Sequence, residues 1–453
     1  MGRSRKRKPC RKRVGKVSYY FHHGGWYIYY RDGRHQVRRR VAEDEQTAAI
    51  AAAEVNAQLA ANAPTQFSFC PISVPELRRR FLDHHEHVRR SSLGTVRRYR
   101  SATQHLIDFV EDRGRPKYAH QIDPDEFVRH LRNKRVPPNG HPNANKKRLC
   151  DKTACFIVET CRSLYGFAGK KRHLPPYVEN PFSGIGGKHF HIEDAKFVYV
   201  FDVESELAFL RAADEWSFAI NFTLAKTGLR TGELIHLLIE EVDLDEGWLH
   251  VHNKPDLGWR IKTRRERSIP LVPELAAVIR RVIGNRAAGP VFLRQRFDPS
   301  QKSRLANTNR KGLVRAIQRR IETAENEADR ILSREDADKI ARTVWQDAGA
   351  LIGERIRKPF IRIAESIGLD DVTCPKSWRH TFATLLQDAN VDPLIRQITL
   401  GHAPSSLGGG ALGMTSIYTH TRPETQKTEI ERAMRLWPKS LQLASQWSQG
   451  GAQ

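Results

Sequence analysis

The stretch KSWRHTFAT, residues 376–384, places a lysine, an arginine and a histidine on one short segment in the last fifth of the chain. Three other short segments are similarly polar and surround it in the sequence. They are AKTGLRTGEL at 225–234, LGH at 400–402 and TSIYTH at 415–420. Each is a modest signal alone, because an arginine flanked by Gly228 and Gly232 fits a simple turn as well as close approach to a phosphate. Their meaning therefore depends on all four together.

The residue types in these segments suit the cleavage of a phosphodiester bond by protein side chains. The sequence has no carboxylate cluster typical of a two-metal site and no GxxxxGK[ST] loop. The work then falls on cations and a protein nucleophile. Arginine binds two phosphate oxygens at once, and the reaction also needs a proton donor for the leaving 5′ oxygen and a hydroxyl to attack phosphorus.

In this order the four segments resemble the boxes of the tyrosine recombinase, or phage integrase, family: TGLRxGEL, [HK]xxRHTFAT, LGH and YTH. The resemblance implies a site-specific recombinase that cuts and rejoins DNA strands without a metal, ATP or other cofactor. Tyr418 would be the nucleophile and would form a 3′-phosphotyrosine. Arg230 and Arg379 would clamp the scissile phosphate, and His402 would donate to its remaining oxygen.

The resemblance also implies roles for other residues. Lys262 corresponds to the lysine of the family's β-hairpin and would be the general acid, with Lys254 as the competing choice. Lys376 stands where most members carry histidine; it can donate to phosphate, but a reference pKa of about 10.4 makes lysine a poorer proton shuttle at neutral pH. Glu233 would orient the first arginine, with plain surface exposure as the alternative. His380 would support the site from behind.

Two intervals depart from the family pattern. His402 and Tyr418 lie 16 positions apart, longer than usual, and the extra residues at 407–413 are rich in glycine. The tyrosine could therefore be delivered late or to a neighbouring protomer. The interval between the two arginines is also long. We assign its excess to the charged, alanine-rich residues 316–365, which we expect to form two helices.

The chain is strongly basic, with a formal net charge of +25 over 453 residues. Residues 1–40 hold fourteen lysines or arginines against one acid, with aromatic residues interleaved. This pattern favours contact with double-stranded DNA, although a solubilising basic tail and a solvated helix face are the simpler alternatives. The arginines that we single out for DNA contact are Arg38, Arg39, Arg40, Arg97, Arg98 and Arg100.

Several other classes of protein are disfavoured. The sequence has no run of eighteen apolar residues for a membrane span, and its basic N-terminus lacks the apolar stretch of a secretory signal. Six cysteines without CxxC pairing fit a reduced cytosol and give no zinc site. The segment DHHEH at 83–87 looks metal-binding, but adjacent histidines on a helix point in different directions. We expect a cytoplasmic, nucleoid-associated protein.

We expect a multidomain chain that is mainly α-helical with small β-sheets. Residues 1–62 predict an arm-like DNA-binding module of three strands and one helix. Residues 67–185 predict a helical core-binding domain, followed by a glycine-rich linker at 181–197. Residues 197–437 predict the mixed α/β catalytic domain, and residues 438–453 a C-terminal tail.

Two details are expected inside the catalytic region. WLHVH at 248–252 and WRIKT at 259–263 are typical of a hairpin, to which residues 269–271 add a closing strand. Residues 422–437 resemble the C-terminal helix that docks on a neighbouring subunit in the family. Its apolar contact residues would be Ile430, Met434 and Leu436.

The leading hypothesis is an active recombinase that integrates or excises a mobile element. In the family such proteins act as homotetramers on paired DNA sites, and an accessory DNA-bending or directionality protein could take part. Two alternatives stay open. A type IB topoisomerase is slightly favoured by Lys376 but disfavoured by the arm-like module and the separate helical domain. A DNA-binding protein that has lost catalysis is disfavoured because no box lacks its arginine, lysine or tyrosine.

Overall fold

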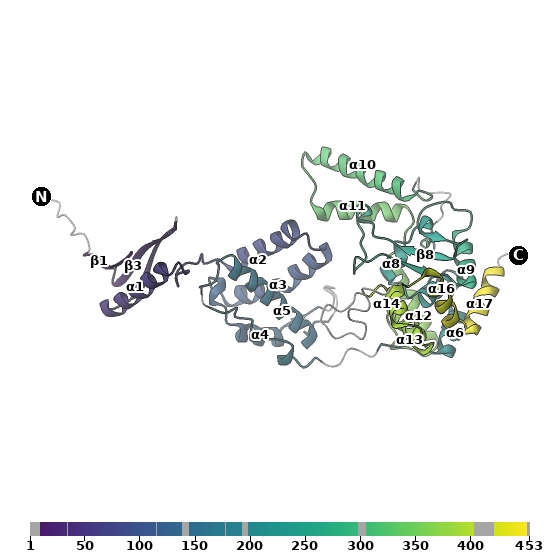
Figure 1. Cartoon of the computed structure of the whole chain (residues 1–453), viewed down its shortest axis with the longest axis horizontal. Helices are drawn as coiled ribbons and strands as arrows, with labels where there is room; N and C mark the ends of the chain where they lie inside the picture. The colour runs from purple at the N-terminus through teal and green to yellow at the C-terminus, as the bar shows by residue number, and fades with distance from the viewer. Residues whose placement is uncertain are drawn as a thin grey trace. The chain divides into compact units, whose positions relative to one another are not determined.

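The computed structural model divides the chain into two compact units, residues 1–195 and 196–453 (Figure 1). The residues that it describes are 10–33, 35–114, 116–137, 145–176, 178–192, 198–297, 305–402 and 421–450. The first unit holds two separate hydrophobic cores, and the second holds a large core with a smaller one beside it. The prediction of a mainly helical, multidomain chain with small sheets is confirmed.

An antiparallel sheet begins the first unit (Figure 1). Its strands, in their order in the sheet, are β1 (Lys12–Val14), β2 (Val17–His22), β3 (Gly25–Asp32) and β4 (His35–Ala42). The prediction of three strands missed a fourth, β1. Gly15, with φ of +55°, turns the chain tightly enough to pair β1 with β2. A short basic strand of this kind lacks the aromatic residues that mark its neighbours.

The alternation of side chains along the strands gives this sheet two different faces. On one face Val17, Ile28 and Tyr30 are buried against Ala52 and Val55 of helix α1 (Glu45–Ala60). The helix therefore covers one side of the sheet only, and the other side is left to tyrosine and arginine side chains.

The rest of the first unit is a helical bundle (Figure 1). Its elements are α2 (Val74–Asp83), the π-helical turn η1 (His84–Val88), α3 (Leu93–Arg113), η2 (Ala119–Gln121), α4 (Pro124–Asn133), β5 (Arg135–Val136), β6 (Lys147–Arg148), α5 (Asp151–Lys170) and η4 (Gly187–His189). The helical prediction for this region is confirmed. Leu77, Phe81, Phe109 and Leu164 lie in the core of the bundle.

The predicted linker at 181–197 is wrong in its first part. Phe182 and Phe190 are buried in the core of the helical bundle. Burying a phenylalanine side chain is worth about 1.5–3 kcal/mol, which outweighs the flexibility that the neighbouring glycines suggest. Asn180 adds a hydrogen bond, because its Nδ2 donates to Arg162 O at 2.8 Å. Residues 193–197 lie outside the described residues.

The second unit packs helices around a small sheet (Figure 1). Its helices are α6 (Val203–Ala212), α7 (Glu215–Thr227), α8 (Thr231–Ile235), α9 (Pro273–Ile283), α10 (Arg310–Ala328), α11 (Arg334–Asp347), α12 (Gly353–Ser366), α13 (Lys376–Asp388), α14 (Pro393–Leu400), α16 (Pro423–Met434) and α17 (Pro438–Gln449), with short 3₁₀ turns η5 (Ile239–Glu241) and η6 (Pro255–Leu257). Trp378 lies at the centre of the core, stacked on Phe201 with ring centroids 3.9 Å apart.

The sheet of this unit differs from the predicted hairpin. Strand β8 (Trp248–Val251) pairs with β7 (Val242–Asp243) and with β9 (Arg267–Pro270), so the closing strand was placed correctly. Residues 259–263 are not its partner. They fold back over the intervening loop, where Asn253 accepts the backbone N–H of Ile261 and donates to Arg264 O. Burial of Ile261 stabilises this loop in place of a regular strand.

The insertion at 316–365 contains three helices rather than the predicted two. Helices α10 and α11 pack on one another and form the smaller core with Leu257 and Trp345. Trp345 Nε1 donates to Leu257 O at 3.0 Å, which ties this pair to the loop after β8. Helix α12 joins the large core instead, through Ile356 and Phe360.

The C-terminal helices also differ from expectation. Ile430 and Met434 of α16 are buried in their own unit, so they are not available to dock on a neighbour, whereas Leu436 is 51% exposed. Residues 438–453, predicted as a tail, include α17, which packs against α9 and buries Leu441 and Ala444. The apolar stripe of α17 is short, so local spacing alone did not predict this helix.

Candidate functional site

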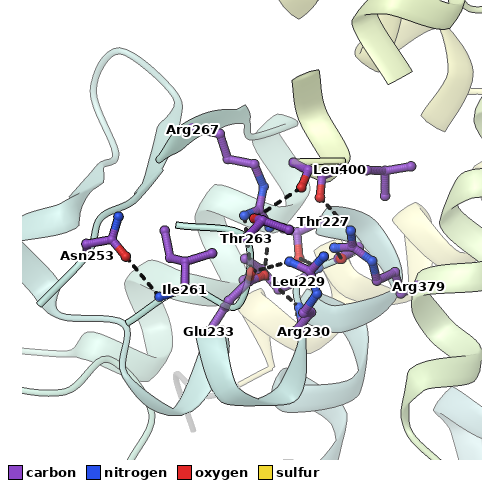
Figure 2. Close-up of polar contacts among 12 residues, drawn as sticks. Thr227, Leu229, Arg230, Glu233, Asn253, Ile261, Thr263, Arg267, Arg379 and Leu400 are labelled. Atoms are coloured by element: carbon purple, nitrogen blue, oxygen red, sulfur yellow. Dashed lines mark hydrogen bonds and ion pairs between the residues drawn. The ribbon is translucent and has the colours of Figure 1, made fainter. Parts of the chain in front are cut away.

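The first arginine segment forms a tight corner between α7 and α8 (Figure 2). Gly228 ends α7 with φ of +60°, and a Cβ there would lie 2.5 Å from Cδ1 of Phe382, so only glycine fits. Arg230 precedes α8, and Glu233 reaches back to it. The carboxylate accepts the backbone N–H and Nη1 of Arg230, each at 2.8 Å. Glu233 is buried and contacts Arg230, so surface exposure is excluded for it.

A second arginine, Arg267 of β9, shares the same carboxylate (Figure 2). Its Nη2 and Nη1 lie 2.7 and 3.2 Å from the Glu233 oxygens, and its Nε donates to Thr399 O at 2.9 Å. Burial alone would raise the pKa of Glu233, but hydrogen bonds and charge from Arg267, followed by Arg230, bring it below its ordinary value. Glu233 is therefore ionised and holds two arginines. Sequence reasoning missed Arg267 as a site residue and used RSIPL only as a landmark.

Arg379, on α13, joins the ends of α7 and α14 (Figure 2). Nη1 donates to Gly228 O at 2.7 Å, and Nη2 donates to Leu400 O. Burial, and then the charge of Arg230, lower the pKa of this guanidinium to about 10, which leaves it a cation at neutral pH. These bonds use two of its five N–H groups. The remaining donors lie beside Arg230, where they can serve an anionic ligand.

His402 follows Gly401, the glycine that caps the end of α14. A Cβ at Gly401, whose φ is +65°, would lie 2.9 Å from Cδ of Arg267. Burial, and then the charges of Arg379 and Arg230, lower the pKa of His402 from its ordinary value of 6.5. The Leu400 carbonyl, two residues earlier, accepts Nη2 of Arg379, and Gly401 lies against the Arg267 side chain, so His402 follows directly from the arginine cluster. Three of the four polar segments thus meet at one place.

The two candidate lysines have different surroundings. Lys254 is buried, and its Nζ lies 2.7 Å from Oε1 of Glu241. Lys262 is exposed, and the hydroxyl of its neighbour Thr263 donates to Gly401 O at 3.4 Å. The loop of Lys262 therefore lies beside the residue that precedes His402 in the chain. The geometry favours Lys262 over Lys254 as a proton donor, and its role stays a prediction.

Lys376 and His380 lie one turn apart on α13. Lys376 is exposed at the first residue of the helix. Burial, and then the charges of Lys376 and Arg379, lower the pKa of His380. Its Nε2 is buried and has no hydrogen-bond partner within the described residues. His380 thus lies beside the arginine that it was expected to support, and that supporting role is still untested.

A buried amide that sequence reasoning missed, Gln426 of α16, also belongs to this network. Its Nε2 donates to Thr399 Oγ1 at 3.0 Å and to a β9 carbonyl at 3.2 Å. The carbonyl oxygen of Thr399 also accepts Nε of Arg267. Helix α14, before Tyr418, and helix α16, after it, are therefore held together at Thr399. No local pattern marks Gln426, because its partners are distant in the sequence.

Tyr418 itself lies outside the described residues, as does the whole of 403–420. Its role as nucleophile and its delivery late or to a neighbouring protomer stay predictions. The described chain resumes at Thr421, two residues before α16 begins.

The open face of the N-terminal sheet alternates tyrosines with arginines. The guanidinium of Arg38 lies 5.5 and 5.3 Å from the ring centroids of Tyr20 and Tyr27. That of Arg11 lies 4.8 and 5.6 Å from Tyr20 and Tyr29. Stacking of this kind holds flat, charged groups on the surface of the sheet, where they can meet a phosphate backbone.

The other arginines predicted to contact DNA are arranged differently. Arg39 pairs across the sheet with a residue of the α1 face, and Arg40 donates to a turn carbonyl at 3.1 Å. Arg97, Arg98 and Arg100 all lie on α3. The guanidinium of Arg98 is 4.4 Å from the centroid of the Phe156 ring of α5. Arg38 is thus the clearest DNA-contact candidate of the six.

The described part of the chain contains neither a metal-binding cluster nor a helix suited to a bilayer. There, no group of three or more His, Cys, Asp or Glu side chains is placed to hold a metal ion. In the DHHEH segment His85 turns inward, with Nδ1 3.0 Å from Ser91 Oγ. No described helix is both long enough and apolar enough to cross a bilayer.

Comparison with known proteins agrees with the order of the four segments. The sequence model of the phage integrase family matches residues 196–425, just over half of the 453 residues. The tyrosine recombinase XerA of Pyrococcus furiosus is 26% identical over 208 residues, which are 46% of this chain. That match covers 51% of the relative, so the chain spans about half the length of the curated relative that it matches.

A solved structure of an integrase resembles the chain in fold. The Tn1549 transposon integrase in complex with transposon right end DNA gives a TM-score of 0.50 at 16% identity, covering 80% of this chain and 99% of that one. A lambda integrase dimer bound to a COC′ core site gives 0.43 at 15% identity, covering 90% and 95%. At such identity the Tn1549 likeness shows a shared fold.

Proposed function

Because the chain belongs to the phage integrase family, we propose that it is a site-specific DNA recombinase that cleaves and rejoins strands through a 3′-phosphotyrosine at Tyr418. One observation carries the proposal: Arg230 and Arg379 come from separate segments and lie together beside the buried carboxylate of Glu233 (Figure 2), and His402 follows two residues after Leu400, whose carbonyl binds Arg379. Cationic donors gathered in this way suit one phosphodiester group, whose charge grows in the transition state.

The proposed reaction conserves the number of phosphoester bonds. The Tyr418 hydroxyl releases its proton to solvent as its oxygen attacks phosphorus, the bond to the 5′ oxygen breaks, and that 5′ oxygen takes a proton from Lys262. Arg230 and Arg379 stabilise the charge on the non-bridging oxygens, and His402 donates to one of them. The 5′ hydroxyl of a partner strand then attacks the phosphotyrosine and releases the tyrosine. No ATP is needed, because the bond energy is kept in the covalent intermediate.

A nicked suicide substrate tests the proposal, because the released 5′ fragment diffuses away and the intermediate accumulates. We expect an adduct that survives denaturation, with the DNA 3′ end attached and mass spectrometry locating the link at Tyr418. A protein that shifts the DNA but never forms an adduct would support the DNA-binding alternative. Relaxation of any supercoiled plasmid, whatever its sequence, would support the topoisomerase alternative.

We further propose that the protein integrates or excises a mobile element as a homotetramer on paired sites, in the cytoplasm and at the nucleoid. These finer statements rest on family membership alone. An accessory bending or directionality protein stays a prediction. Sequencing the DNA that flanks the gene for paired repeats, followed by recombination of those repeats with the purified protein, would test this proposal.

Binding of DNA should reverse the pKa shift of His402. In the free protein, burial and the charges of Arg379 and Arg230 keep the pKa below 6.5, so the ring is neutral at pH 7. A bound phosphate offsets those positive charges, so the pKa should rise and the protonated fraction at pH 6 to 7 should increase. Titration of the imidazole NMR signal, assigned by its loss in His402→Gln, measures this. A pKa above 6.5 without DNA would contradict the geometry.

Substitution Arg38→Gln should weaken binding to duplex DNA through the N-terminal sheet. If Arg38 neutralises one phosphate, the slope of log K against log salt should fall by about 0.9. A suitable control is Lys12→Gln, since Lys12 lies in the same sheet but is paired with Glu45 of α1. Equal losses in the two variants would mean that net charge, rather than the tyrosine-lined face, sets the affinity.

A further inference from the structure

A cavity of about 960 Å³ lies in the second unit between α12, the segment 294–297 and the α10–α11 pair. Its lining contains six cations and one carboxylate. The cations are Arg294, Arg296, Arg320, Arg355, Lys358 and Arg362. The carboxylate is that of Asp347, which pairs with Arg320 at 2.7 Å. The lining therefore carries a large excess of positive charge in a volume typical of ligand sites.

One wall of the cavity is a basic stripe on α12. Arg355, Lys358 and Arg362 are spaced three and four residues apart, so they share one face of the helix. All three are exposed, and within the described residues their side chains make no hydrogen bond or ion pair, whereas Arg357 on a different side of the helix donates to Thr373 O and pairs with Glu354. The opposite face of the helix holds Ile356 and Phe360 in the core. The helix is thus fixed by its apolar face and presents unpaired cations on the other.

The facing wall is built from the segment after α9. Arg294 Nη2 donates to Gln346 O at 2.7 Å and the guanidinium lies 5.2 Å from the Phe297 ring centroid, but its Nε is buried and has no partner among the described residues. Arg296 beside it is exposed and likewise unpaired there. Trp216 supplies apolar surface, with its own N–H donated to Leu293 O at 2.8 Å.

This cavity is separate from the arginine pair. Trp216 is the second residue of α7 and Arg230 follows the end of the same helix. A helix of 13 residues is about 20 Å long, so roughly that distance separates the Trp216 side of the cavity from the corner that holds Arg230. The residues that line the cavity include neither Arg230 nor Arg379, so a phosphate held by those two arginines leaves the cavity free for another group.

We propose that this cavity is a second phosphate-binding site, which takes closely spaced phosphate groups through the α12 stripe and the arginines at 294 and 296. Several uncompensated cations around a small volume need several negative charges in that volume. Consecutive phosphates supply them, and each guanidinium can bind two phosphate oxygens. An acidic peptide brings one carboxylate per residue together with its bulk, and fits the volume less well. The phosphates could come from a DNA backbone or from a free polyphosphate.

Inorganic tripolyphosphate is the probe for the full-length protein, with binding measured by calorimetry. The variant Arg355→Gln/Lys358→Gln should lose at least about tenfold in affinity, since it removes two charge-assisted contacts. Its matched control is Lys339→Gln/Arg342→Gln on α11, which has the same spacing and the same loss of charge but acts on cations already paired with Asp336 and Asp338. The control should bind as the unchanged protein does. Equal affinity in all three proteins would overturn the proposal.

Duplex DNA distinguishes the two sources of phosphate. If the DNA backbone fills the site, the slope of log K against log salt should fall by about 1.8 in the double variant and clearly less in the control, and DNA should displace tripolyphosphate. An unchanged slope with tripolyphosphate binding lost would assign the site to a free polyphosphate. If a polyglutamate peptide binds the protein and tripolyphosphate does not, the proposal is overturned in favour of a protein partner. The adduct at Tyr418 is scored separately, so the two proposals can fail independently.

Discussion

Tyr418→Phe should abolish the covalent protein–DNA adduct, lowering cleavage of the suicide substrate by about 10⁴-fold or more, the scale of losing a nucleophile. The substitution removes only a hydroxyl, so binding of the duplex should change little. Single-turnover cleavage and a separate binding titration measure the two effects. The natural control is Tyr199→Phe, because Tyr199 is the next tyrosine back along the chain and packs against Phe201. An adduct that persists in Tyr418→Phe would refute the assignment.

The same variant can report how the tyrosine is delivered. The residues on either side of its segment are anchored through Thr399 and Gln426, and the 16 positions between His402 and Tyr418 leave a long reach. If the tyrosine acts in a neighbouring protomer, mixing Tyr418→Phe with a variant defective in Arg379 should restore cleavage in part. If it acts within its own protomer, the mixture should stay inactive.

Arg379→Lys should lower the rate of cleavage by about 10² to 10³-fold while DNA binding is largely kept. Lysine retains the charge but loses the planar fork, so it cannot hold the phosphate and the carbonyls of Gly228 and Leu400 at once. Arg379→Ala should be at least as inactive, but it also leaves two buried carbonyls without a donor. Its thermal stability must therefore be measured beside its activity.

The matched comparison for this prediction is Arg230→Lys. Arg230 is partly exposed, and within the described residues its guanidinium bonds only to Glu233, whereas Arg379 is buried and its guanidinium bonds to two backbone carbonyls. Both variants should lose cleavage, but only the Arg379 variant should lose thermal stability as well. A binding loss as large as the loss of cleavage would contradict their assigned role in the transition state.

Much of the fold could be predicted from local patterns, and the errors have identifiable physical causes. Helices of the bundle were marked by apolar residues at helical spacing, and Leu77 and Phe81 lie in its core as that pattern requires. The linker was misplaced because Phe182 and Phe190 are buried by contacts with distant helices. The hairpin was misplaced because β8 pairs with β9 across a loop that folds on itself. The short strand β1 was missed for lack of aromatic residues.

The sequence by itself determined the family and proposed the candidate residues, because Arg230, Arg379 and His402 lie in short segments whose order is readable without a structure. The tertiary structure alone decided what holds them together. Arg267 meets Glu233 across 34 positions and Thr399 across 132, and no local pattern encodes contacts over such distances. Only the tertiary structure shows that Lys254 is buried whereas Lys262 is exposed. It also shows that the cations of α12 line the same cavity as the arginines at 294 and 296. Residue type and spacing fix what chemistry is available, whereas burial and long-range contacts fix which side chains can use it.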